Sequence, residues 1–137
     1  MLKIILIILG ILIIGWVFLS KSSAPESDII DRNGLHWHAD LSINILGETQ
    51  EIPAGIGLEK LPHKPMHTHD RDSVIHMEFS SLVREDDIRL GRFFAIWGKE
   101  FNKDCIFDKC AGPNNQLTIL INGKENLEFE NYMMRDG

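Results

Sequence analysis

The first twenty residues contain a charge-free apolar run that restricts where the chain can reside. Residues 4–19 carry no charged side chain and are rich in isoleucine and leucine, so every face of a helix formed there is apolar. At 1.5 Å per residue these sixteen residues span about 24 Å, and snorkelling Lys3 and Lys21 extend this toward the ~30 Å hydrocarbon core. The sequence therefore predicts a transmembrane anchor over residues 1–20.

A cleaved signal peptide is the alternative interpretation of the same segment. The run is close to the roughly 7–15 apolar residues of a signal peptide, and small residues follow it. Lys3 and the free amino group outweigh Lys21, which favours an amino terminus in the cytoplasm. Both interpretations place the rest of the chain outside the cytoplasm, and the anchor predicts a single-pass protein of the cell membrane.

The composition changes after this segment. Residues 21–28 are small and polar and contain Pro25, which is typical of a linker, so we expect one folded domain over residues 29–137. From Pro25 onward the chain has twelve basic and twenty acidic residues, a net charge of −8 with histidine neutral. Nucleic acid is excluded as a partner, because phosphate binding needs a basic surface.

Several segments show the alternation of apolar and polar residues that is typical of half-buried strands. Residues 36–45 and 74–79 alternate most clearly, and shorter strands are predicted at 49–52 and 117–121. Asn122-Gly123 is a strong hairpin signal after the last of these. Residues 61–73 contain two prolines and no apolar period, so we expect a loop there.

One helix is predicted between these strands. Leu90, Phe93 and Trp97 recur at helical spacing, Asp86 or Asp87 can cap the start, and glycine at position 98 can end it. Strands, one helix and a terminal hairpin predict a small α+β domain with a mostly antiparallel sheet and one packed helix, β-grasp-like. No strand follows the final Asp-Gly, so two interpretations stay open: the domain ends irregularly there, or a last strand is missing.

The two cysteines, Cys105 and Cys110, are separated by four residues. Outside the cytoplasm a local disulfide is the expected state of such a pair. A soft-metal pair is the alternative, but no second cysteine pair completes a zinc ribbon.

Histidines carry the main functional signal of the chain. Five of the six form two His-x-His pairs and one single residue: His36, His38, His67, His69 and His76. On a strand, residues two apart project from the same face, so two imidazoles of one pair lie side by side, opposite the apolar residues. If residues 36–45 and 74–79 are neighbouring strands, three imidazoles converge, and the preceding loop can bring the second pair over them.

This pattern predicts a transition-metal site. Neutral imidazoles bind copper and zinc well, and Asp70 and Glu78 are candidates for further ligands or for the acceptors that orient an imidazole. Met66 and Met77 can add thioether ligands, although Met77 has the parity of the core residues and packing within the loop is the simpler role for Met66. His63 has no partner at a fixed spacing and is left out.

Three functions remain open on this evidence. A metal-binding protein of the cell surface is favoured. A metalloenzyme, hydrolytic or redox, would use Glu78 or Asp70 as a base beside an open metal position, but the chain has neither an HExxH helix nor a serine nucleophile elbow. In a metal-free interaction module the histidines would pair with acids, and stability would not respond to a chelator.

A set of short motifs also resembles a known family. HWHADLSI, EIPAGIG, MHTHD, VIHMEF, LGRFFAIWGK and INGKENLEFENYMMRDG, within residues 35–137, are similar to an uncharacterised, largely archaeal family of small membrane-anchored or secreted proteins. The resemblance implies a final strand after the last Asp-Gly. It implies no activity or substrate.

Overall fold

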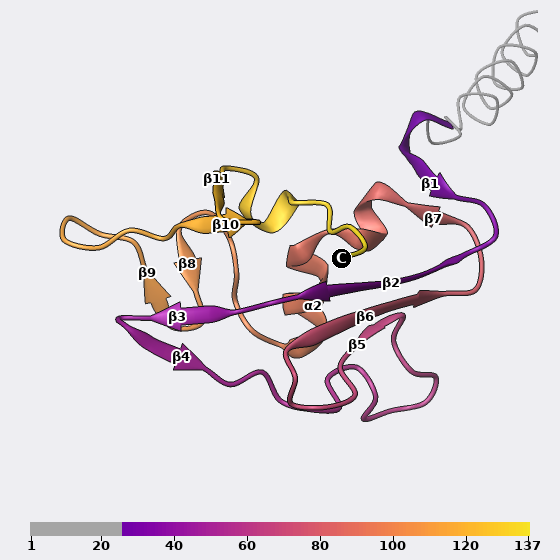
Figure 1. Ribbon diagram of the computed structural model, residues 1–137, viewed down its shortest axis with the longest axis horizontal. Helices are drawn as coiled ribbons and strands as arrows, with labels where there is room; N and C mark the ends of the chain where they lie inside the picture. Colours follow the sequence, from indigo (N-terminus) through magenta and orange to yellow (C-terminus); the bar gives the residue numbers. More distant parts are fainter. Residues whose placement is uncertain (1–25) are drawn as a thin grey trace, which may run out of the picture.

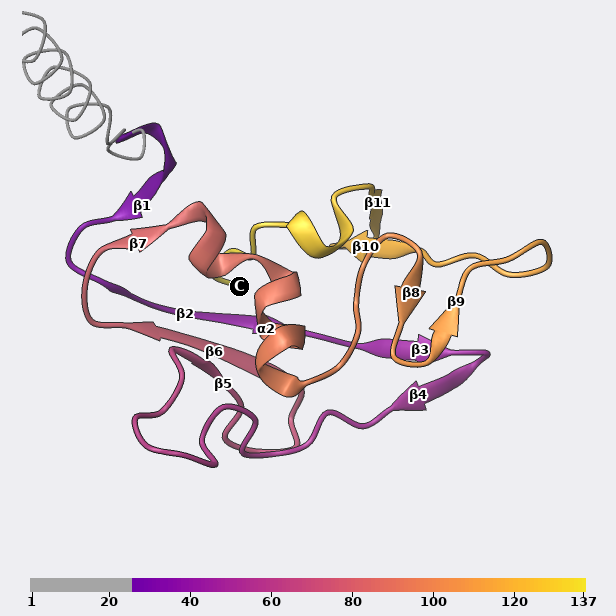
Figure 2. The ribbon, with the colours of Figure 1, turned by 180° about the vertical axis from the view of Figure 1, so that it is seen from behind.

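A small three-stranded antiparallel sheet and one α-helix form the centre of the domain (Figure 1). The computed structural model describes residues 26–137. The strands lie in the order β2-β6-β5, and Figure 2 shows α2 crossing one face of β2 and β6. Their bounds are Leu35–Asp40 for β2, Val74–Phe79 for β6, Met66–His67 for β5 and Leu90–Trp97 for α2.

Short antiparallel pairs surround this centre. β1 pairs with β7, β3 with β4, β8 with β9 and β10 with β11, and three short 3-10 helices complete the described elements. The bounds of the strands are β1 Ile29–Asp31, β3 Ile43–Ile45, β4 Glu48–Gln50, β7 Val83–Arg84, β8 Cys105–Ile106, β9 Lys109–Cys110, β10 Ile119–Ile121 and β11 Lys124–Asn126. Those of the 3-10 helices are η1 Glu26–Asp28, η2 Glu85–Ile88 and η3 Phe129–Asn131. Cys105 and Cys110 face each other across the β8–β9 hairpin and form a disulfide.

The core lies between the sheet and α2. Phe93 and Phe94 of the helix are almost completely buried and pack with Ile75 and Met77 of β6. In β2, Trp37 is half-buried on this same side, while its sequence neighbours are exposed. The alternation of burial along β2 and β6 therefore divides the sheet into an apolar face under the helix and a polar face in contact with solvent.

Some boundaries differ from the sequence prediction for a physical reason. The predicted strand 36–45 is interrupted after Asp40, because Asp40 pairs with Val74, the first residue of β6, and no partner strand extends further. β3 then pairs locally with β4 through a turn in which Leu46 has a positive φ. The described residues thus form five small sheets and not one continuous β-grasp-like sheet.

The membrane-spanning part of the predicted architecture needs correction. Among residues 26–137, no helix is long and apolar enough to cross a bilayer. The eight-residue helix α2 is about 12 Å long, well short of the ~30 Å hydrocarbon core. The predicted anchor, residues 1–20, lies outside the described residues, so the described fold is a small α+β domain alone.

Candidate metal centre

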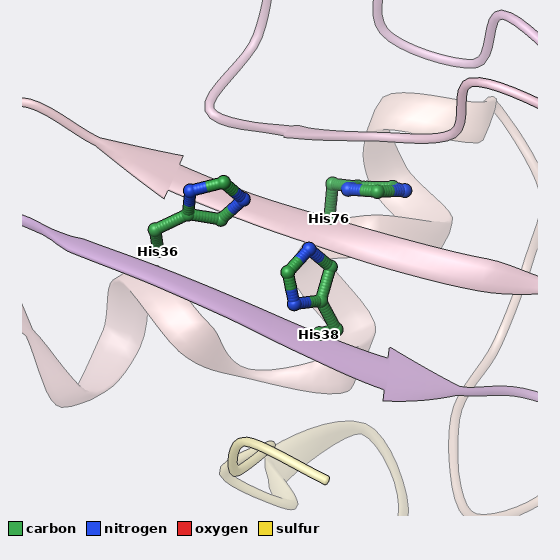
Figure 3. Close-up of side chains that lie close together, drawn as sticks. All are labelled: His36, His38 and His76. Carbon is green, nitrogen blue, oxygen red and sulfur yellow. The ribbon is translucent and has the colours of Figure 1, made fainter.

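Histidines of β2 and β6 meet on the polar face of the sheet. His38 lies directly opposite His76 in the antiparallel register, and His36 lies opposite Glu78. The ring centroids of His36 and His38 are 4.8 Å apart, and those of His38 and His76 are 4.7 Å apart. Figure 3 shows the three imidazoles gathered above the two strands. Strand pairing therefore brings together three side chains separated by forty residues of sequence.

Strand β5 extends this row of imidazoles. His67 of β5 lies opposite His76, so His38, His76 and His67 form a line across all three strands. The rings of His67 and His76 are nearly parallel with centroids 5.7 Å apart, and the ring of His69 is 4.6 Å from that of His76. We call the surface formed by these five histidines and Glu78 the histidine face.

The first group of possible ligands on this face is His36, His38 and His76. Each offers one ring nitrogen, and the three nitrogens lie within 4.8 Å of one another. Two nitrogens bound to one tetrahedral ion at 2.0–2.1 Å are about 3.3–3.4 Å apart. Since all three side chains are at least partly exposed, small rotations about their side-chain bonds can close this difference.

The second group is His67, His69 and Glu78, whose ligand atoms also lie within 4.8 Å of one another. The Nε2 atoms of His67 and His69 are 3.1 Å apart, close to the spacing of two ligands of one ion. The Nδ1 atom of His67 is 3.1 Å from the carbonyl oxygen of Lys64. Because a carbonyl only accepts, Nδ1 carries the proton, and the neutral ring presents the lone pair of Nε2 to the group.

The environment favours the neutral imidazole at two positions of this face, His67 and His76. Burial lowers the pKa of His67 below its usual value, against an opposing contribution from the Lys64 carbonyl. Burial also lowers the pKa of His76, and the neighbouring rings of His69 and His38 lower it further. A neutral imidazole has a free lone pair, so metal binding need not displace a proton from it.

The remaining candidates from the sequence lie elsewhere. Asp70 is exposed and belongs to neither group. Met66 and Met77 face each other between β5 and β6, and both are fully buried in the core on the other face. These thioethers are therefore not ligands of the histidine face.

Two further residues lie near the site that the sequence prediction did not include. The carboxylate of Asp136 accepts a hydrogen bond from the backbone N–H of His38 at 2.9 Å, and its Oδ1 is 3.9 Å from Nδ1 of the same residue. His63 lines a cleft of about 520 Å³ together with His67, His69 and Glu78. Neither has a spacing signal, because one comes from the far end of the chain and the other from an irregular loop.

The comparisons with known proteins do not identify the chain. No protein-family model, curated protein or solved structure shows a significant match to it. The resemblance to the archaeal family therefore stays a prediction, and the structure itself supports one statement about function: the described domain contains histidine groups that can hold a metal ion.

Proposed function

We propose that this protein binds a transition-metal ion, copper or zinc, on the histidine face. The observation that carries the proposal is the group of three nitrogens, from His36, His38 and His76, within 4.8 Å of one another on two paired strands. Paired strands hold their side chains in fixed relative positions, so the ligands are arranged before the ion arrives. The first two are well exposed, which leaves an entry path for the ion.

The donor set supports the choice of copper or zinc. Imidazole nitrogen suits both ions, and the order of affinities favours copper when both are present. Cys105 and Cys110 are joined to each other, so neither provides a thiolate. Hard ions such as calcium and magnesium prefer oxygen ligands, and this group offers nitrogen only.

We further propose that the domain works outside the cytoplasm. The Cys105–Cys110 disulfide supports this location, because disulfides persist in oxidising compartments and are rare in the reducing cytosol. A role in binding, storage or delivery fits the exposed ligands better than catalysis.

Metal analysis of the full chain tests the proposal. The protein is purified without a polyhistidine tag in a mild non-ionic detergent, equilibrated with Zn²⁺ or Cu²⁺, and freed of unbound metal. We expect at least one ion per chain, with loss of an ion in the His36→Ala/His38→Ala double variant. Glu125→Gln is the control, because it removes an exposed carboxylate of β11 that belongs to neither group.

Two results would contradict the proposal. In one, the wild-type chain takes up no ion at stoichiometric level. In the other, the double variant binds metal as tightly as the wild type while circular dichroism shows that both are folded. A metal-free interaction module predicts the first result.

A further inference from the structure

The histidine face holds more ligands than one ion can use. It presents five imidazoles and one carboxylate, whereas zinc in proteins is nearly always four-coordinate. These six side chains divide into two groups of three that share no residue, and each group is compact by the same distance limit. The histidine face therefore has enough ligands for a second ion.

The positions of the strands separate the two groups. His36 and His38 come from β2, His67 comes from β5, and β6 lies between these strands. Neighbouring strands are about 4.8 Å apart, so β2 and β5 are separated by roughly 10 Å. The ring of His76 lies between them, 4.7 Å from that of His38 and 5.7 Å from that of His67. One ion cannot take all five imidazoles across this width.

The second group has the stronger preorganisation of the two. His67 is 5 % exposed, and its contact with the Lys64 carbonyl fixes both the ring orientation and the proton position. Its Nε2 is already 3.1 Å from that of His69. These two nitrogens need little movement to share one ion.

Glu78 connects the two groups. Its Oε1 atom is 3.3 Å from Nε2 of His36 in the first group and 4.0 Å from Nε2 of His67 in the second. A carboxylate has two oxygens and can bind one ion with each, and its negative charge offsets the repulsion between two divalent cations. No other described carboxylate is as close to both groups.

We propose that the histidine face binds two metal ions, one at His36–His38–His76 and one at His67–His69–Glu78, with the Glu78 carboxylate shared between them. This inference rests on the proposed function, because it takes the first ion as bound. The second ion then has three protein ligands, which leaves its fourth position for water or an added ligand. The second ion faces the 520 Å³ cleft, which gives small molecules access to it.

The number of ions and the place of each can be measured with Zn²⁺ on the full, untagged chain. We expect two ions per wild-type chain, by elemental analysis and by calorimetric titration. Two variants that spare the buried His67 address the sites separately. His36→Ala/His38→Ala should retain only the second ion, and His69→Ala should retain only the first.

Glu78→Gln tests the shared carboxylate. It keeps the size of the side chain and removes the charge, so we expect the second ion to bind at least about tenfold more weakly, because even residues that only support ligands commonly have effects of 10–100-fold. In the wild type loaded with two Cu²⁺ ions, magnetic coupling through the carboxylate should reduce the electron paramagnetic resonance signal per copper. Glu125→Gln removes an exposed carboxylate of β11 outside both groups and should leave the stoichiometry and both affinities unchanged.

The outcomes separate this inference from the proposed function. One ion per wild-type chain, retained in His69→Ala and lost in His36→Ala/His38→Ala, overturns the second site and leaves the first. One ion lost in both variants indicates a single ion shared by the two groups, and this also overturns the inference. No ion at all refutes both proposals. Loss of an ion in Glu125→Gln would show that the ligands are wrongly assigned.

Discussion

Gly57 lies against β5. Replacing it by alanine should destabilise the domain more than the strain of its backbone conformation alone would. A Cβ atom built on Gly57 would be 2.6 Å from the carbonyl oxygen of Met66 and 3.3 Å from the Cβ of His67. The first contact is with backbone, which no rotation of a side chain can relieve. The loop and β5 must therefore move apart.

The magnitude follows from two contributions. Gly57 has a φ of +79°, and a side chain in this left-handed region costs about 1–2 kcal/mol. Moving the loop also weakens the hydrogen bonds from the N–H of Lys64 to the Gly57 carbonyl and from the N–H of Thr68 to the Ile56 carbonyl, each worth about 1 kcal/mol. We expect Gly57→Ala to lower the free energy of unfolding by about 3–4 kcal/mol.

Gly55→Ala is a closely matched control. Gly55 lies two residues earlier with a φ of +81°, and its Cβ would meet nothing within 4 Å. Gly55→Ala introduces the same backbone strain without the steric clash, so we expect the free energy of unfolding to fall by about 1–2 kcal/mol. Urea unfolding with the disulfide intact and a chelator present, followed by tryptophan fluorescence, gives both values. Equal losses in the two variants would refute the close approach of the loop to β5.

Three further predictions concern stability. Burial lowers the pKa of His67 and His76 in the folded state, so the unfolded chain takes up protons first as the pH falls. The free energy of unfolding of the metal-free protein should therefore be fully present well above pH 6.5, the ordinary pKa of histidine, and decrease as the pH falls below it. Urea titrations at several pH values measure this, and a flat profile would contradict it. Phe93 is fully buried, and Phe93→Ala should lower the free energy of unfolding by about 3–5 kcal/mol. Leu120 is 60 % exposed, and Leu120→Ala should change it by less than about 0.5 kcal/mol. Similar losses in the two variants would place Phe93 outside the core. Replacing both disulfide cysteines by serine should cost about 2 kcal/mol, because the disulfide closes a loop of only six residues, and the metal content should not change.

Local pattern was sufficient for part of the fold and of the candidate site. The period of two along a strand depends only on the local backbone, so the sequence places His36 and His38 on one face and Trp37 on the other, as the structure has them. The end of the helix at Gly98 follows from the preference of glycine for the left-handed region, and its φ is +72°.

Pairing between distant segments could not be derived in this way. Nothing in the sequence states that His38 lies opposite His76, since register depends on the loops and on the packing of the whole sheet. β5 is two residues long, too short to show a period, so the sequence predicts a loop over residues 61–73 and misses this strand. Asp136 reaches His38 from ninety-eight residues away in sequence.

The division of the sheet into two faces has a consequence for how variants of the site behave. His36 and His38 are exposed, and neither belongs to the core or to the residues packed against it, so their removal should leave the packing of Trp37 and Phe93 intact. Surface substitutions of this kind usually change stability by less than about 0.5 kcal/mol. His67 differs, because it is buried and its ring contacts the Lys64 carbonyl, and its replacement leaves that carbonyl without a partner. Loss of metal in His36→Ala/His38→Ala therefore reports the loss of ligands, whereas loss of metal in a His67 variant combines ligand removal with a change in β5.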